Sequence, residues 1–359
     1  MERQTLTFRR SLAAAIASLA FLAAQTSPTN TDYSIPSPPP PGPPGTLLRQ
    51  HPLHDGAAIP GAARNVLLLY TTIDPRGRRV AVTGTLALPP GPPPPGGWPI
   101  LSWAHGTKGN APQCAPSRDP RPNVEQRISP AWVRAGYAVA QSDYEGEGTP
   151  GIHPYFNAEA STHDLTDIVR AARQIDPEIG RRWVIMGHSE GGTAAIAAAA
   201  GAPHWAPDLQ LLGAVAYAPA SHIARSLRIM AHGKSASPIL PLVAMMIQGI
   251  ALSDPAIDLT HVLSAAGLRH QPELQQRCAG ALMRDIWWNA TPTDRYFRHP
   301  LAIGPLIIVQ GSADDLVRPS ATADLRAQLC LRGANVALRS IPGGTHDSIL
   351  QIAQPAVLR

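Results

Sequence analysis

The sequence predicts an α/β fold in which a mostly parallel sheet is covered by helices on both faces. Short apolar runs alternate with segments of helical periodicity, which is the pattern of a parallel sheet buried on both sides. Several of the runs end in Gly or Asp, which favour turns. The chain has 359 residues, 44% of them hydrophobic, which is enough for one large core or at most two domains.

The predicted elements follow one another in a regular order. Residues 65–73 and 79–88 are strand-like runs on either side of the turn sequence DPRGR, so we expect them to pair. Further apolar runs predict strands within residues 98–106, 137–144, 183–189, 211–220, 305–315 and 335–341. Apolar residues at helical spacing predict helices over 160–175 and 320–334. In such sheets the functional residues gather where the strands end.

The first residues predict export. Arg3, Arg9 and Arg10 precede an apolar stretch too short to span a bilayer, so residues 1–24 are expected to be a signal peptide, of the general secretory or the twin-arginine type. Residues 25–46 are rich in proline and predict an extended linker or arm. No later run predicts a transmembrane segment. We therefore expect the mature protein to be soluble and secreted, to the periplasm or outside the cell.

One long segment breaks the alternation of strands and helices. Residues 221–300 hold no clear strand but contain apolar, helix-like sequence, which predicts a helical cap or lid inserted over the sheet. The α/β core is then expected to comprise residues 47–220 and 301–359. The apolar composition of the insertion suggests that it covers the site and binds an apolar group. The alternative is that its helices are core filler.

Composition excludes several classes of function. The net charge is +5, but the arginines are scattered and the only lysines are Lys108 and Lys234, so we expect no nucleic-acid partner. Three cysteines allow one disulfide and one free thiol. No Cys/His cluster has zinc-like spacing, so neither a metal nor a cofactor is expected.

A nucleophile motif stands between a predicted strand and an alanine-rich helix. Residues 187–191 read GHSEG and fit G-x-S-x-G, in which Ser189 occupies a strained turn. Small residues are needed on either side because side chains there would collide with the neighbouring strand and helix. The N–H of Glu190, at the helix start, is expected to stabilise an oxyanion. The alternative is a serine that only caps the helix.

A serine nucleophile needs a base and an acid that orients the base. Asp314 and Asp315 follow one predicted strand, and His346 follows the next, in the chain order expected after the serine. Sequence position favours His346 as the base and one of the two aspartates as the acid. The alternatives are a surface histidine and a helix-capping aspartate.

A second oxyanion donor is expected from the sequence SWAHGTKG, which also follows a strand. Its His-Gly turn can offer backbone N–H groups to a developing negative charge. We name Thr107 as the donor and Gly106 as the alternative. The competing interpretation is an ordinary glycine turn.

Five motifs together resemble the secretory lipase family of α/β-hydrolases, the lipase A type, over about residues 65–350. They are, in order, SWAHGTKGNAPQCAPS, SDYEGEGTPGIHPYF, GHSEGG, IIVQGSADDLVRPS and IPGGTHDSIL. The resemblance implies the α/β-hydrolase fold, an inserted helical lid, and hydrolysis of acyl esters through a Ser-Asp-His triad. It also implies that Ser189, Asp314 and His346 form that triad.

The resemblance extends to further positions and differs at two. Relatives carry a disulfide that corresponds to Cys114 and Cys278. Arg318 stands where proline is usual, which keeps Asp315 open as the acid, and Glu147 stands where leucine is common, which would alter polarity near the site entrance. Cys330 would remain as a buried thiol on the apolar face of a helix.

The function predicted from the sequence is thus a secreted serine carboxylic ester hydrolase, either a lipase or an esterase. Its partner would be a small-molecule or lipid ester, with a possible lipid–water interface. A serine peptidase or amidase on the same fold is the main alternative, because ester and amide cleavage share the acyl-enzyme route. A non-catalytic binding protein on the same scaffold is the third hypothesis.

Overall fold

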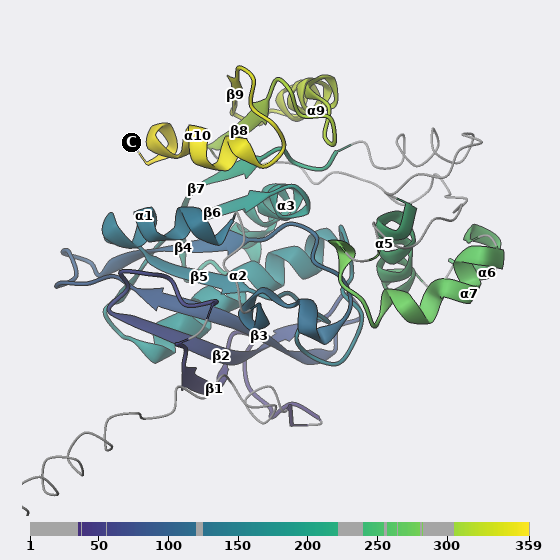
Figure 1. The fold of residues 1–359 in the computed structure, drawn as a ribbon. Helices are drawn as coiled ribbons and strands as arrows, with labels where there is room; N and C mark the ends of the chain where they lie inside the picture. The colour runs from purple at the N-terminus through teal and green to yellow at the C-terminus, as the bar shows by residue number, and fades with distance from the viewer. Residues whose placement is uncertain are drawn as a thin grey trace, which may run out of the picture.

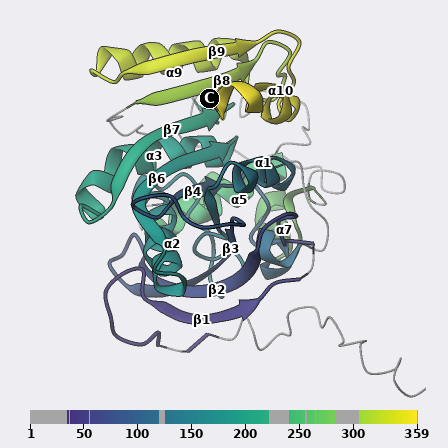
Figure 2. The same ribbon diagram turned by 90° about the vertical axis from the view of Figure 1, so that its left-hand side faces the viewer.

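A nine-stranded sheet runs through the described part of the chain, in the order β1-β2-β3-β5-β4-β6-β7-β8-β9 (Figures 1 and 2). The strands are β1 (Leu47–Pro52), β2 (Arg64–Ile73), β3 (Arg79–Leu88), β4 (Trp98–Ala104), β5 (Ala138–Ser142), β6 (Ile179–His188), β7 (Gln210–Tyr217), β8 (Leu306–Gly311) and β9 (Val336–Ile341). The computed structural model describes residues 35–36, 38–54, 56–119, 125–221, 240–254, 257–263, 265–280, 282 and 305–358. The expected signal peptide at 1–24 lies outside these ranges.

The sheet is antiparallel at one end and parallel over the rest. β2 and β3 pair along their whole length, from Arg64 with Leu88 to Ile73 with Arg79, as the turn between them predicts. β1, which the sequence did not predict, adds to the outer side of β2. From β5 onwards every neighbouring pair is parallel. The predicted α/β fold with a mostly parallel sheet is confirmed.

Helices cover both faces of this sheet (Figure 1). The helices of the core are α1 (Ser129–Arg134), α2 (Ala158–Ile175), α3 (Glu190–Trp205), α9 (Pro319–Leu331) and α10 (Ser348–Val357). One apolar cluster contains residues of α2, α3 and α9, and a second contains residues of α1 and α10. The two clusters lie on opposite faces because successive strand residues point to opposite sides of the sheet. No helix within the described ranges has both the length and the apolar character to cross a bilayer.

The free cysteine is exposed, contrary to the prediction. The buried residues of α9 are Thr322, Leu325 and Leu329, which form one stripe at helical spacing. Cys330 follows Leu329 directly and is therefore turned by about 100° around the helix, out of that stripe. Its thiol faces the surface.

The described part of the insertion is helical and carries its own apolar cluster. It contains α5 (Leu240–Ser253), α6 (Leu259–Val262) and α7 (Ala265–Leu274), which lie beside the core in Figure 1. Tyr155, from the core, belongs to the same cluster. Hydrogen bonds tie the insertion to the core, among them those from Ala279 N to Lys108 O (2.7 Å) and from Arg76 Nε to Leu252 O (2.7 Å). The sequence IWWNA at 286–290, which carries much of the apolar character of the insertion, lies outside the described residues.

Candidate active site

Ser189 occupies a strained turn between β6 and α3. Its φ of 57° and ψ of −116° lie in a region that side-chain-bearing residues rarely adopt. The backbone is held there by hydrogen bonds from Ser189 N to Tyr217 O (2.9 Å) and from Ala220 N to Ser189 O (3.1 Å). The side chain is partly exposed. This is the geometry of a serine presented at the end of a sheet.

The two glycines of the motif are required sterically. A Cβ at Gly187 would overlap the carbonyl oxygen of Gly191 in the helix. A Cβ at Gly191 would overlap the carbonyl oxygens of Ala104 and His105, at the end of β4. Larger residues at either position would therefore push α3 away from the sheet and change the position of Ser189.

His346 and Asp314 are hydrogen-bonded to each other. The distance between His346 Nδ1 and Asp314 Oδ2 is 2.9 Å. Asp314 follows β8 and is 4% exposed, whereas the neighbouring Asp315 is exposed. The structure therefore brings Asp314, and not Asp315, to the histidine. Within the described residues, His346 Nε2 is buried and has no hydrogen-bond partner, so its lone pair is available.

The surroundings of Asp314 favour its ionised form. Its Oδ1 accepts hydrogen bonds from the backbone N–H groups of Leu316 (3.0 Å) and Val317 (2.8 Å), and its Oδ2 accepts one from Gln310 Nε2 (3.1 Å). Burial by itself would raise the pKa of Asp314, but the hydrogen bonds from His346 and Val317 outweigh it and hold the pKa below its usual value. A carboxylate here fixes the His346 tautomer that carries its proton on Nδ1.

The loop after β4 places Thr107 and Gly106 beside the serine. A Cβ at Gly106 would lie 3.4 Å from Ser189 Cβ, so this backbone passes close to the serine. The Gly106 N–H donates to Glu125 Oε1 (2.7 Å) and is therefore occupied. Thr107 Oγ1 donates to Glu190 Oε2 (2.8 Å), which joins the two predicted oxyanion residues. Of the two backbone donors considered for this loop, the geometry favours Thr107.

Glu190 also contacts a residue that the sequence did not indicate. Its Oε1 lies 2.8 Å from His153 Nε2, and both side chains are buried. His153 is stacked on the ring of Tyr144. The carboxylate of Glu190 therefore connects the loop after β4 with the loop that precedes α2.

Glu125 is a second residue that sequence reasoning missed. Its Oε1 lies 3.1 Å from His188 Nδ1, and its Oε2 lies 2.8 Å from Lys108 Nζ. Burial by itself would raise the pKa of Glu125, but Lys108 and His188 together lower it well below its usual range. Glu125 is therefore a buried carboxylate that accepts hydrogen bonds from Gly106 N and Lys108 Nζ, in the loop after β4, and from His188, the neighbour of Ser189. No sequence motif marks it.

His188 links the serine turn to the histidine loop. Its Nε2 lies 2.9 Å from the carbonyl oxygen of His346, and the two ring centroids are 4.6 Å apart. His188 precedes Ser189 directly, so this contact brings the two ends of the site together. The side chains of His188, His346 and Asp347 offer ligand atoms that all lie within 4.8 Å of one another.

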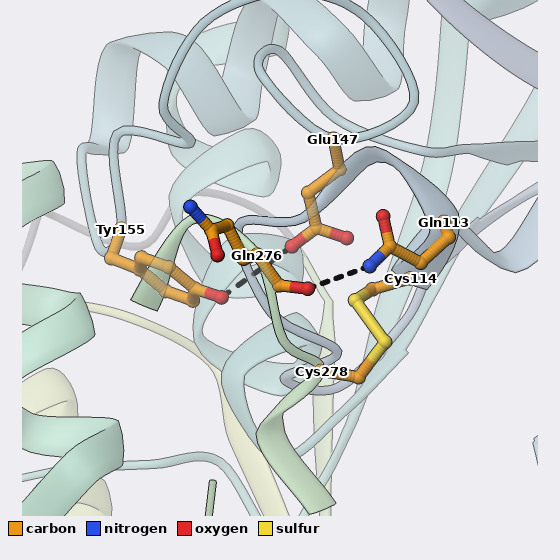
Figure 3. Close-up of a disulfide and its surroundings, with 6 residues drawn as sticks. All are labelled: Gln113, Cys114, Glu147, Tyr155, Gln276 and Cys278. Carbon is orange, nitrogen blue, oxygen red and sulfur yellow. Dashed lines mark hydrogen bonds between the residues drawn. A yellow bond between two sulfur atoms is a disulfide. The ribbon is translucent and has the colours of Figure 1, made fainter. Parts of the chain in front are cut away.

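A disulfide joins Cys114 to Cys278, as the family resemblance implied (Figure 3). Their Cα atoms are 5.4 Å apart, and the bond links the loop after β4 to the segment that follows α7. Gln113 Nε2 donates to the carbonyl oxygen of Gln276 (2.7 Å) beside it. A disulfide and a hydrogen bond thus attach the insertion to the loop after β4.

Glu147 lies in the interior and not at an entrance. Its side chain is fully buried, and its Oε1 accepts a hydrogen bond from Tyr155 Oη (3.5 Å; Figure 3). Its Oε2 lies 3.7 Å from His105 Nε2. Burial, together with the nearby carboxylate of Glu190, raises the pKa of Glu147 well above its usual value. Burial lowers the pKa of His105 to about 3. His105 is therefore neutral near pH 7, and burial favours the neutral form of Glu147.

Comparison with known families gives one match within the chain. Residues 124–300 match the model of the secretory lipase family. That segment contains the serine turn, Glu125, Glu147 and Glu190, and it ends before Asp314 and His346. The resemblance inferred from the motifs is confirmed over these residues. No curated protein matches the sequence.

Solved structures of similar fold include lipases and esterases. Lipase A of Candida antarctica aligns with a TM-score of 0.71 and 18% identity, over 88% of this chain and 80% of its own. The rice cell wall degrading esterase LipA of Xanthomonas oryzae aligns with a TM-score of 0.68 and 19% identity, over 88% of this chain and 95% of its own. A putative hydrolase of Legionella pneumophila aligns with a TM-score of 0.71 and 18% identity, over 87% and 97%. The α/β-hydrolase fold is therefore established, and the family match supports a carboxylic ester hydrolase.

Proposed function

We propose that this protein is an exported serine ester hydrolase that uses Ser189, His346 and Asp314 as its triad. The observation that carries the proposal is the convergence of two features. A serine stands in a strained turn at the end of β6, and the preceding residue, His188, contacts His346. The Nδ1 of His346 is bound to a buried carboxylate, while its Nε2 has no partner among the described residues. A free imidazole lone pair oriented by a carboxylate is what a serine nucleophile needs from its base.

The proposed reaction has two steps. Ser189 Oγ attacks the acyl carbonyl carbon while His346 Nε2 accepts the serine proton, and the negative charge on the carbonyl oxygen is stabilised by the N–H groups of Glu190 and Thr107. His346 then protonates the leaving alcohol, and the acyl group remains on Ser189. In the second step water attacks the acyl-enzyme, with His346 again accepting the proton, and the acid is released. Asp314 stabilises the imidazolium in both steps.

Export is part of the proposal. It is supported by the predicted signal peptide, by the family match and by the Cys114–Cys278 disulfide, since disulfides persist in oxidising compartments. The chemistry of the site does not distinguish an ester from an amide substrate. We favour esters because the matched family is a lipase family.

A series of p-nitrophenyl esters from acetate to palmitate, with a p-nitroanilide of the same acyl group, tests the reaction. We expect ester turnover and much slower amide turnover. Ser189→Ala should lower kcat by about 10⁴ or more while the fold is retained. A fluorophosphonate probe should label Ser189. Labelling of another serine, or activity that survives Ser189→Ala, would overturn the proposal, and binding of esters without turnover would favour the non-catalytic alternative.

We also propose that the insertion provides the acyl-binding surface. Its support is the apolar composition of α5, of which Met246 and Ile250 remain partly exposed. Each methylene buried there would contribute about 0.8 kcal/mol. Met246→Ala and Ile250→Ala should shift the preferred acyl length while acetate turnover persists. Leu338→Ala, a partly buried residue on β9, is the control and should leave the preference unchanged. An unchanged preference in all three variants would indicate that these helices are core filler.

A further inference from the structure

A group of three side chains of metal-binding type includes His346, the proposed base. Ligand atoms of His188, His346 and Asp347 lie within 4.8 Å of one another, and Asp347 Oδ1 is 3.9 Å from His188 Nε2. The side chain of His188 is 5% exposed and that of His346 13%, whereas Asp347 is 65% exposed. The group therefore has a buried side made of two imidazoles and an open side made of a carboxylate.

Both imidazoles are oriented as they are in known metal sites. His188 Nδ1 contacts the carboxylate of Glu125 at 3.1 Å, and His346 Nδ1 contacts the carboxylate of Asp314 at 2.9 Å. In metal centres, a ligating histidine almost always donates its other ring N–H to a carboxylate, a carbonyl or water, which fixes the tautomer and strengthens the ligand. Here both Nδ1 atoms have carboxylate partners, which leaves the Nε2 atom of each ring to bind a metal: that of His346 has no partner among the described residues, and that of His188 would exchange its contact with the His346 carbonyl oxygen.

The charges around these nitrogens favour a cation. Asp347 and Asp314 are acidic, whereas Glu125 is already paired with Lys108, and the two nitrogens are ligands that zinc prefers. Zn–N and Zn–O bonds of about 2.0–2.2 Å put neighbouring ligand atoms roughly 3.3–3.5 Å apart in a tetrahedron. The separations between the ligand atoms of His188, His346 and Asp347, which extend up to 4.8 Å, are longer than this. Asp347 is exposed and follows the loop residue His346. Rotation of its side chain and a small movement of the loop would therefore bring the three ligand atoms to the distances that zinc requires.

We propose that His188 Nε2, His346 Nε2 and a carboxylate oxygen of Asp347 bind one zinc ion, and that this ion inhibits the enzyme reversibly. On binding, the proton of His188 Nε2 passes to solvent and the contact with the His346 carbonyl oxygen is replaced by a bond to the metal. The ion takes the His346 lone pair that would otherwise accept the serine proton. Water completes the coordination. The inhibition rests on the proposed function, whereas the binding does not.

No sequence pattern marks such a site. His188 and Asp347 are far apart in the chain, and the return of the chain from β9 brings His346 and Asp347 to His188. An exposed His–acid pair elsewhere provides a matched control. Within α7, His270 Nδ1 lies 2.7 Å from Glu273 Oε1, and both are about equally exposed.

The binding test uses zinc chloride and the Ser189→Ala protein, which retains all three ligands. Zinc binding is measured by titration calorimetry in Ser189→Ala, in Ser189→Ala/Asp347→Ala and in Ser189→Ala/Glu273→Ala. We expect Asp347→Ala to weaken binding at least about tenfold, the smaller effect seen when even an outer-shell partner is lost. Glu273→Ala should leave this binding event unchanged. Equal effects of the two substitutions, or no binding, would overturn the proposal.

The activity test uses the full protein with an intact serine. Zinc should abolish ester turnover, excess EDTA should restore it, and Asp347→Ala should raise the inhibitory zinc concentration at least about tenfold relative to its own zinc-free rate. Turnover that resists zinc overturns the inhibition. If no variant hydrolyses esters but calorimetry shows the Asp347-dependent binding, the proposed function fails and the metal site stands. If esters are hydrolysed and that binding is absent, the metal site fails alone.

Discussion

Glu125 and His188 form a buried hydrogen bond of 3.1 Å between Oε1 and Nδ1, one residue before the serine. The other nitrogen of His188 lies 2.9 Å from the carbonyl oxygen of His346. His188 therefore contacts an acceptor at each of its ring nitrogens. This pair connects the serine turn, the oxyanion loop and the histidine loop.

We predict that Glu125→Gln lowers stability strongly. The amide can still accept from the Gly106 N–H, but the negative charge that offsets Lys108 and His188 is lost. Removing one partner of a buried ion pair costs about 3–5 kcal/mol. Denaturant unfolding should show a loss in this range, while Glu273→Gln, at an exposed pair, should change stability little. Adding Lys108→Met removes the unpaired ammonium and should recover part of the loss. An effect no larger than that of Glu273→Gln would show that Glu125 is not a buried carboxylate that stabilises the fold through Lys108.

The two adjacent aspartates should differ greatly in their effect on catalysis. Asp314→Asn removes the carboxylate that fixes the His346 tautomer, and kcat should fall by about 10⁴. Asp315 is exposed, so Asp315→Asn should leave kcat close to that of the native protein. Steady-state kinetics on p-nitrophenyl acetate, with circular dichroism to check the fold, compares them. The reverse order would mean that Asp315 is the acid.

Glu147 should make the stability of the protein depend on pH. Its pKa is raised in the folded state, so the folded protein holds a proton that the unfolded chain releases, and stability falls as pH rises above the ordinary pKa. Glu147→Gln resembles the protonated acid because its amide carries no charge. The variant should match the native protein near about pH 4 and gain up to about 1.4 kcal/mol per pH unit above that.

Thermal unfolding over a range of pH measures this difference. Glu178→Gln, at an exposed position, is the control and should follow the native curve at every pH. A Glu147→Gln protein whose advantage is the same at all pH values would show that Glu147 is not held protonated by the fold.

Loss of the disulfide should destabilise the protein more than loss of the free thiol. The Cys114→Ser/Cys278→Ser variant should be less stable by about 2–5 kcal/mol, because the unfolded chain gains freedom. Cys330→Ser should change stability little, since Cys330 is exposed and free. A maleimide should react with Cys330 in the folded protein. Protection of Cys330 from the maleimide would contradict its exposed position.

Much of the fold could be predicted because its signals are local. The hairpin of β2 and β3 follows from two apolar runs and a turn, and the serine turn follows from five consecutive residues with a helix after them. β1 was missed because LLRQHP has little alternation and stands next to the proline-rich arm. Cys330 was misassigned by one position, since the buried stripe of α9 passes through Leu329.

The surroundings of the triad could not be read from the sequence in the same way. Glu125, Lys108 and His188 lie in three separate segments, and a single glutamate in a loop has no periodicity or motif. The pairing of Glu190 with His153 is also a product of tertiary contact. The choice between Asp314 and Asp315 depended on backbone conformation, because adjacent side chains point away from the backbone in different directions.

The disulfide closes a ring of the chain that holds only one of the three proposed triad residues. Cys114 and Cys278 are separated by 164 positions and close a ring that contains Ser189 and the described helices of the insertion up to α7. Asp314 and His346 lie outside that ring, on the C-terminal tail. A protease that cuts once within the ring releases no fragment until the disulfide is reduced, so the nicked protein runs at full size on a non-reducing gel. One cut between Cys278 and Asp314, by contrast, separates Ser189 from Asp314 and His346 even when the disulfide is intact.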